Sequence, residues 1–167
     1  MIDYIARHCD TSLEGLQVGI GDDAAVLRPP PGRDLALCTD TLVEAVHFFP
    51  DDPPGSIGHR ALAVNLSDLA AMGAEPAWSL LALTMPRADQ HWVEQFVTGF
   101  TALARRHRVA LLGGDLCRGP LGVTVQAGGW LPRGQAMTRS GSRPGDAVYV
   151  SGNLGEAAAA VALIGAG

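Results

Sequence analysis

The sequence predicts a mixed α/β domain, of the α+β kind, in which a mixed β-sheet is packed by helices. Apolar segments of strand length alternate along the chain with segments whose apolar residues recur every three or four positions, as they do in helices. Apolar residues make up 47% of the 167 residues and charged residues only 17%, so the chain can bury a core. This length suits one domain, or one domain and the beginning of a second.

The first elements are a short amphipathic helix over 2–9 and a glycine-rich segment over 18–27. Six later segments are short, rich in apolar or β-branched residues and bounded by turn residues, which is typical of strands. They are 35–40, 42–48, 78–85, 109–112, 122–131 and 147–150.

Three further helices are predicted between or after these strands. One covers 57–72, with Ser56 as its N-cap. The next covers 88–107 and has the clearest amphipathic pattern. Its apolar residues at helical spacing are Trp92, Phe96, Phe100 and Leu103. An alanine-rich helix covers 154–164.

Charge and composition exclude several functions. The net charge is −5, and all twelve basic residues are arginine, which excludes a lysine-containing P-loop and lysine Schiff-base chemistry within the chain. No basic stripe favours nucleic acid, and no apolar run reaches the roughly 18 residues of a membrane span. Cys9, Cys38 and Cys117 lack the spacing of a disulfide framework, and no signal peptide is visible. We therefore expect a reduced, cytoplasmic protein.

Four aspartates occupy positions suited to binding a ligand. Asp23 follows a Gly-x-Gly turn, Asp40 ends a predicted strand, and Asp115 follows a strand and two glycines. Asp68 lies in a helix that is apolar almost all round, which predicts a buried helix with Asp68 and Asn65 on one face. A buried carboxylate must be paired, protonated or bound to a metal. Because clustered oxygen ligands suit Mg²⁺, we expect a magnesium site.

Each of these residues also has a plain structural interpretation. Asp23 can belong to a solvated turn and Asp115 to an ordinary loop, whereas Asp68 is the hardest to explain in this way. His47, beside two phenylalanines, is typical of a histidine packed next to the core, and Cys38 of a small buried side chain. The spacing of Cys and His residues shows no zinc pattern.

Five motifs follow one another in register. They are Gly19–Leu27 (GIGDDAAVL), Thr39–Phe48 (TDTLVEAVHF), Ala63–Ala74 (AVNLSDLAAMGA), Leu112–Asp115 (LGGD) and Met137–Asp146 (MTRSGSRPGD). Together, over nearly the whole chain, they resemble the thiamine-monophosphate kinases, a family in the superfamily that includes aminoimidazole ribonucleotide synthetase. The segment around Asp68 is similar across that superfamily, whereas Thr39–Phe48 and Met137–Asp146 resemble the thiamine enzymes in particular.

The resemblance implies the fold of the N-terminal domain of aminoimidazole ribonucleotide synthetase, and a homodimer with a β-barrel-like interface. It implies ATP-dependent phosphorylation of thiamine monophosphate to thiamine diphosphate, with several Mg²⁺ ions. The implied metal ligands are Asp23, Thr39, Asp40, Asp68 and Asp115. Gly114, Asp115 and Arg139 are implied to contact ATP. His47 is implied to contact thiamine monophosphate, and no catalytic group beyond the metal ligands is assigned.

The sequence departs from the family pattern in three ways: at Cys38, at an N-terminus that begins late relative to the family, and at an end that comes soon after the second domain starts. Cys38 stands where relatives often have a hydroxyl side chain, and a thiol is a poor Mg²⁺ ligand. We expect an ATP- and Mg²⁺-binding, dimerising domain over 1–142 and the start of a second domain over 143–167, hence an N-terminal portion with little or no activity alone. The alternatives are aminoimidazole ribonucleotide or selenophosphate synthesis, hydrogenase maturation, or a non-catalytic module for dimerisation and nucleotide binding.

Overall fold

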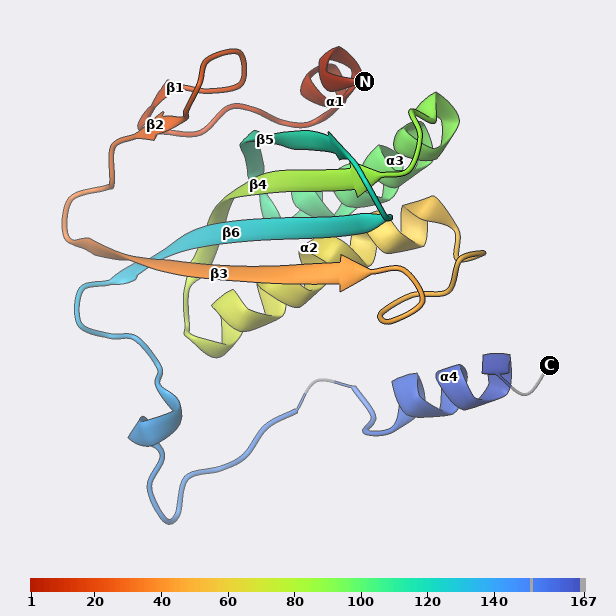
Figure 1. Ribbon diagram of the computed structural model, residues 1–167. Coiled ribbons are helices and arrows are strands. Elements are labelled where there is room, and N and C mark those ends of the chain that lie inside the picture. The colour runs from red at the N-terminus through yellow and green to blue at the C-terminus, as the bar shows by residue number, and fades with distance from the viewer. Residues whose placement is uncertain (151, 166–167) are drawn as a thin grey trace. The chain divides into compact units, whose positions relative to one another are not determined.

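The computed structural model describes residues 1–150 and 152–165 (Figure 1). The chain divides into two compact units, Met1–Met137 and Thr138–Gly167. The first unit contains the sheet and all the residues that line the cavities described below. Within the described residues, no helix has both the length and the apolar character needed to cross a bilayer.

Four strands form the main sheet of the first unit. They are β3 (Arg33–Val43), β4 (Glu75–Met85), β5 (Ala110–Arg118) and β6 (Gly122–Pro132). Their order across the sheet is β3-β6-β4-β5. Strand β6 pairs antiparallel with both β3 and β4, whereas β4 and β5 are parallel. A parallel pair needs a long connection, which helix α3 provides between β4 and β5.

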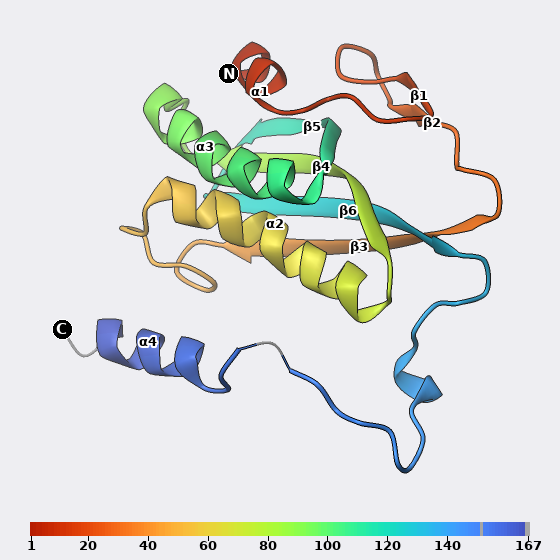
Figure 2. The same cartoon turned by 180° about the vertical axis from the view of Figure 1, so that it is seen from behind.

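Helices α2 (Pro54–Ala71) and α3 (Gln90–His107) lie side by side on one face of this sheet (Figure 1, Figure 2). We call that face the helical face and the opposite one the open face. Helix α3 begins at Asp89, whose side chain accepts a hydrogen bond from the backbone N–H of Trp92 at 3.0 Å. Apolar side chains of both helices and of the strands form the main core. Its fully buried members include Leu62, Leu83, Phe96, Phe100, Val123 and Val125.

The two helices cross at glycines. A Cβ atom on Gly99 of α3 would collide with the carbonyl oxygen of Gly55 of α2. A Cβ atom on Gly58 of α2 would likewise collide with the carbonyl oxygen of Phe96. Glycine lowers helix propensity, but at these positions only a residue without a side chain lets the two backbones approach this closely.

The open face is covered at one end by a smaller cluster. Strands β1 (Leu16–Val18) and β2 (Val26–Leu27) form a short antiparallel pair. Apolar side chains of this pair pack against two tryptophans of the sheet, Trp78 and Trp130. Beyond them, large apolar side chains of the edge strand β3 are exposed on this face. They are Leu35, Leu37 and Val43.

Helix α1 (Ile2–His8) packs against the main core through Ile5, which is buried. The guanidinium of Arg105 in α3 donates a hydrogen bond to the carbonyl oxygen of His8 at 3.0 Å. The C-terminal end of α1 is therefore tied to α3.

The predicted fold class is confirmed as a mixed sheet packed by helices, and the helix predicted over 88–107 is α3. The strand predicted over 42–48 is wrong beyond Val43. Ala45 adopts a left-handed conformation with φ 60°, and its N–H donates to the carbonyl oxygen of Phe48 at 2.8 Å, so the chain turns there. Helix α2 starts at Pro54 rather than after Ser56, because proline suits the first turn of a helix.

The second unit contains a short 3-10 helix, Arg139–Gly141, and helix α4 (Glu156–Gly165). The prediction of a strand over 147–150 is wrong: no strand pairing includes those residues in the part of the chain that the structure describes. Val148 and Tyr149, two of the residues that suggested a strand, are exposed and do not pack in a core.

Candidate functional site

A cavity of about 780 Å³ lies between the glycine-rich loop of residues 19–25 and the open face of the sheet. The loop joins β1 to β2, and all four strands of the main sheet contribute lining residues. The polar side chains that line it are Asp22, Asp23, Thr39, Asp115, Thr124 and Gln126. No basic side chain is among these described lining residues, so an anionic ligand would need a cation beside it.

The loop places Asp23 at this cavity through a glycine-dependent turn. Gly21 has φ 117°, a conformation that side chains rarely permit. The backbone N–H of Asp23 donates to a carboxylate oxygen of Asp22 at 2.9 Å, which fixes the turn from within. The Asp23 carboxylate is exposed and free to face a ligand.

Strand β5 places Gly114 and Asp115 at the same cavity. A Cβ atom on Gly114 would collide with the carbonyl oxygen of Leu81, so glycine is needed where β5 approaches β4. The Cys117 thiol donates to a carboxylate oxygen of Asp115 at 2.8 Å. This hydrogen bond, the largest cause, raises the pKa of Cys117.

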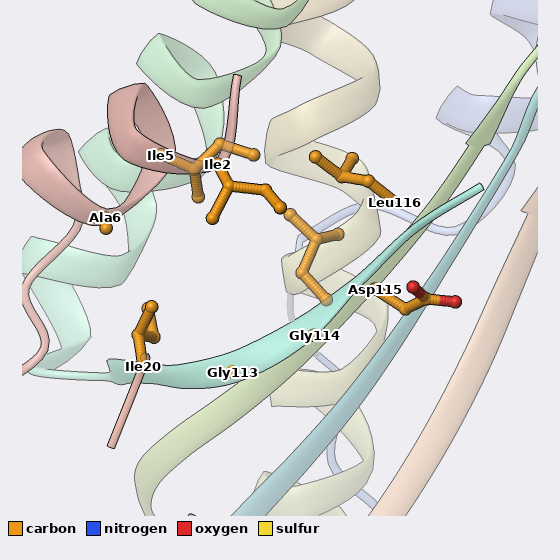
Figure 3. A pocket seen from close by; sticks show the side chains of 9 residues that line it. Ile2, Ile5, Ala6, Ile20, Gly113, Gly114, Asp115 and Leu116 are labelled. Atoms are coloured by element: carbon orange, nitrogen blue, oxygen red, sulfur yellow. The ribbon is translucent and has the colours of Figure 1, made fainter. Parts of the chain in front are cut away.

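An apolar pocket of about 150 Å³ adjoins the cavity and shares Ile2, Ile20, Gly113, Gly114 and Asp115 with it. Side chains of α1, β4 and β5 form the remaining wall: Ile5 and Ala6, Leu81, and Leu116. Figure 3 shows the Asp115 carboxylate extending away from Ile2 and Ile5. Charge on Asp115 is thus directed away from the apolar surface.

Strand β6 contributes two residues that the sequence analysis did not single out, Thr124 and Gln126. Both lie opposite β3, where Gln126 pairs with Thr39 and Thr124 with Thr41. The hydroxyls of Thr41 and Thr124 are hydrogen-bonded at 2.8 Å. Because alternate residues of a strand share a face, the pattern of 122–131 contained the signal that would have placed them there.

Asp40 and Thr39 are adjacent in β3 and therefore point to opposite faces of the sheet. Thr39 lines the cavity on the open face. Asp40 lies on the helical face, on the same side as Cys38, whose thiol donates to the backbone carbonyl oxygen of Asn65 in α2 at 3.4 Å. The charge of Asp68 also reaches this thiol, so Asp40 and Asp68 both lie near Cys38.

The prediction that Asp68 is buried is wrong, because its side chain is exposed while Asn65 is completely buried. Asn65 satisfies its amide by donating to the carbonyl oxygen of Ala61 at 3.0 Å. The sequence of α2 is apolar almost all round because it contains alanines such as Ala70 and Ala71, and these alanines are exposed in the structure. Alanine favours helix formation on a surface as well as in a core, so these residues do not require burial.

Burial raises the pKa of the Cys38 thiol to about 11, and the charges of Asp68 and Asp40 add to the effect. Cys38 is therefore a neutral thiol near neutral pH. It faces α2 as a weak hydrogen-bond donor and is half-buried, so the prediction of a small buried side chain is met only in part.

The five predicted metal ligands are thus divided by the sheet. Asp23, Thr39 and Asp115 share the cavity on the open face, while Asp40 and Asp68 lie near Cys38 on the helical face. Over residues 1–150 and 152–165, no three Asp, Glu, His or Cys side chains come together closely enough to hold a metal ion by themselves.

The two remaining predicted residues, Arg139 and His47, are not among the residues that line the cavity. Arg139 begins the 3-10 helix of the second unit and is exposed. His47 lies in the turn after β3, where its Nδ1 accepts a hydrogen bond from the backbone N–H of Val43 at 3.0 Å. Phe48, next to it, is buried in the main core and anchors this turn.

Comparison with known proteins identifies the family of this fold. The family model described as "AIR synthase related protein, N-terminal domain" matches residues 21–131, which include most of the residues that line the cavity, β3 to β5, nearly all of β6 and both long helices. The chain belongs to this family. It is also a homologue of thiamine-monophosphate kinases. It is 48% identical over 163 residues to Thiamine-monophosphate kinase of Salmonella typhimurium, an alignment that covers 96% of this chain and 50% of that protein.

Solved structures agree with this relationship. The crystal structure of Thiamine-monophosphate kinase from Stenotrophomonas maltophilia has a TM-score of 0.87 and 47% identity, and the match covers 99% of this chain and 51% of that one. A structure of AaThiL complexed with AMPPCP and TMP has a TM-score of 0.76 and 35% identity, covering 87% and 47% of the two chains. The present chain spans about half the length of these relatives.

Proposed function

We propose that this chain is the N-terminal, nucleotide-binding part of an enzyme that transfers a phosphoryl group from ATP to thiamine monophosphate, giving thiamine diphosphate. The observation that carries the proposal is the 48% identity with a thiamine-monophosphate kinase over 96% of the chain. The similarity to AaThiL complexed with AMPPCP and TMP supports the choice of both substrates.

The residues of the cavity suit a direct phosphoryl transfer. The attacking group of thiamine monophosphate is a phosphate oxygen that is already anionic, so the reaction needs no strong general base. The main obstacle is repulsion between two anionic substrates, and phosphoryl transfer is catalysed largely by positioning and charge neutralisation. The absence of basic side chains among the lining residues makes neutralisation by cations the consistent choice.

The donor chemistry of the cavity fits Mg²⁺. Its polar lining consists of carboxylate, hydroxyl and amide groups, and Mg²⁺ is commonly held by one or two carboxylates together with substrate phosphates and water. Bound Mg²⁺ neutralises phosphate charge and orients the phosphates. Asp23, Thr39 and Asp115 would hold ions from the open face, and Asp40 and Asp68 are proposed to contribute from the side of Cys38.

The other proposed contacts follow from the resemblance. Gly114 and Asp115 are proposed to contact ATP, with Arg139 as a bidentate donor to phosphate oxygens. The lack of a side chain on Gly114 lets phosphate approach the backbone of β5 closely. His47 is proposed to bind thiamine monophosphate from the turn after β3.

We also propose the domain boundaries 1–142 and 143–167, a cytoplasmic location and a homodimer with a β-barrel-like interface. The exposed side chains of Leu35, Leu37 and Val43 on the open face support pairing between two copies there, because exposed apolar surface of this kind marks interaction sites.

The test is a kinase assay with a protein that carries this sequence and the second half that its relatives have. It should form thiamine diphosphate from thiamine monophosphate only when ATP and Mg²⁺ are present. Asp115→Asn should lower kcat by about 100-fold or more, because a metal ligand supplies several kcal/mol of charge stabilisation. Asp10→Asn, a change at an exposed aspartate that does not line the cavity, is the matched control and should leave kcat unaltered.

The same assay decides between the alternatives. A panel of substrates for the other ATP-dependent reactions of the superfamily should give no product above background. The 167-residue chain alone is proposed to bind nucleotide without turnover, because it spans about half of its relatives. Absence of thiamine diphosphate from the full-length reaction would overturn the proposal.

A further inference from the structure

The turn that carries His47, residues 44–52 between β3 and α2, is held by several hydrogen bonds and one buried side chain. The N–H of Ala45 and the carbonyl oxygen of Phe48 are hydrogen-bonded at 2.8 Å. The N–H of His47 donates to the carbonyl oxygen of Val43 at 2.9 Å. Phe48 is 4% exposed and anchors the turn in the main core, so the turn has a fixed position relative to the sheet.

The imidazole of His47 is part of this network. The backbone N–H of Val43 donates to Nδ1 of His47 at 3.0 Å. A backbone N–H can only donate, so Nδ1 must be the unprotonated nitrogen and the ring proton lies on Nε2. The exposed ring therefore presents Nε2–H as a hydrogen-bond donor to its surroundings.

Arg60 of α2 contacts this turn through its guanidinium group. Its Nη1 donates to the carbonyl oxygen of His47 at 2.7 Å, the shortest contact of the turn with a charged group. Its Nη2 lies 3.6 Å from a carboxylate oxygen of Asp52. That same oxygen accepts the N–H of Phe49 at 3.2 Å. The guanidinium thus binds the turn directly at His47 and lies close to Asp52, the residue that binds the N–H of Phe49.

We propose that Arg60 is a positioning residue for thiamine monophosphate: it fixes the turn so that His47 offers Nε2–H to an acceptor oxygen of that substrate. The proposal rests on the proposed function, in which His47 contacts thiamine monophosphate. An N–H donor fixed before binding avoids the entropic cost of ordering the side chain on binding, which improves affinity. Arg60 itself touches backbone and Asp52, not the substrate.

The geometry indicates which part of the Arg60 contact matters. The pair with Asp52 is long at 3.6 Å, and the Arg60 side chain is 43% exposed, so the ion pair itself contributes little. The short hydrogen bond to the His47 carbonyl oxygen needs a donor at a fixed place. Lysine carries a single ammonium group on a flexible stem and cannot satisfy the carbonyl and the carboxylate in the same planar geometry.

The first measurement is ¹⁵N NMR of the His47 ring in the 167-residue chain. The wild-type chain should show protonated Nε2 and unprotonated Nδ1. In Arg60→Gln the ring should lose this fixed tautomer and show averaged nitrogen shifts, with Arg60→Lys intermediate. Arg87→Gln removes an exposed arginine that also pairs with an aspartate, at 3.8 Å, and should leave the His47 signals unchanged. Unchanged signals in both Arg60 variants would overturn the proposal.

The second measurement uses the full-length kinase described above. Arg60→Gln should raise KM for thiamine monophosphate by about three- to tenfold, the range expected for one poorly placed hydrogen bond, and change KM for ATP by less than about twofold. Arg60→Lys should fall between, and Asp52→Asn, which keeps an acceptor for Phe49, should have the smallest effect. Equal increases in both KM values, or an effect of Asp52→Asn as large as that of Arg60→Gln, would contradict a positioning role.

The two measurements separate the proposals. An active wild-type enzyme with unaltered KM in the Arg60 variants would overturn the role of Arg60 and leave the proposed function standing. An inactive wild-type enzyme would overturn the proposed function and the substrate assigned to His47, while the NMR result would still decide whether Arg60 fixes the ring.

Discussion

Leucines 42 and 37 belong to the same strand, yet Leu42 is 5% exposed and Leu37 is 56% exposed. Leu42 points to the helical face, where α2 and α3 cover the sheet (Figure 2). Leu37 points to the open face, where cover is limited to one end. The comparison shows that one face of this sheet is buried under helices and forms the core, whereas much of the other face is left uncovered.

Exchanging each leucine for alanine tests this difference directly and gives the largest expected effect. Leu42→Ala should lower the free energy of unfolding by about 2–5 kcal/mol, because it opens a cavity in the core. Leu37→Ala should cost less than about 1 kcal/mol in a monomer, because little buried area is lost. Denaturant unfolding measures both values.

Equal losses for the two variants would contradict the division into two faces. If the loss in Leu37→Ala grows with protein concentration, then the open face is buried between two copies, which would sharpen the comparison and support the proposed dimer.

The glycine crossing behind the helical face is the next test. Gly99→Ala should lower the free energy of unfolding by about 1–3 kcal/mol, because the new methyl group collides with the backbone of α2 and forces the helices apart. Thr98→Ala, one residue away on the exposed side of α3, is the control. Thermal or denaturant unfolding should show no comparable loss there, and a stabilised Gly99→Ala variant would disprove the close crossing.

The smallest expected effect concerns a half-buried thiol, Cys9, and an exposed one, Cys117. Burial raises the pKa of Cys9 to about 11 from its ordinary value of 9.0, although the charge of Arg105 opposes this. The unfolded chain therefore loses this proton first, and the free energy of unfolding should fall as the pH rises from about 9 to about 11.

Cys9→Ala should reduce the fall in the free energy of unfolding between pH 9 and pH 11, because it removes a thiol that loses its proton more readily in the unfolded chain than in the folded one. Cys117→Ala should leave most of that decline, because the Cys117 thiol is exposed and its pKa is raised mainly by a hydrogen bond with Asp115 rather than by burial. Denaturant unfolding at several pH values measures the slopes, and identical slopes in wild type and Cys9→Ala would refute the assignment.

Much of the helical face could be predicted from the sequence. The spacing of Phe96 and Phe100 indicated α3 and its buried side, since a helix of period 3.6 leaves a clear pattern when large apolar residues form the stripe. Helix α2 gave a weaker signal. Alanine occurs in helices both in a core and on a surface, so the sequence pattern of α2 could not show that Asp68 is exposed.

The candidate site was predicted less completely. Asp23 and Asp115 were singled out because glycines precede them, and the structure brings both to one cavity. Asp40 was placed with them, although strand alternation sets it on the face opposite to Thr39. The turn at Ala45 was missed because left-handed backbone in a residue other than glycine leaves no mark in composition.

The position of β6 has a consequence for how the chain is made. This strand is the last of the sheet in sequence, yet it lies between β3 and β4 and pairs with both. The first residue of β3, Arg33, pairs with Pro132 at the end of β6. Strand β3 therefore has no strand to pair with until nearly the whole first unit has been synthesised. During synthesis on the ribosome, the backbone hydrogen-bonding groups of β3 therefore stay unpaired and can pair with other chains. We expect a nascent chain that is halted before β6 to be the species most dependent on chaperones.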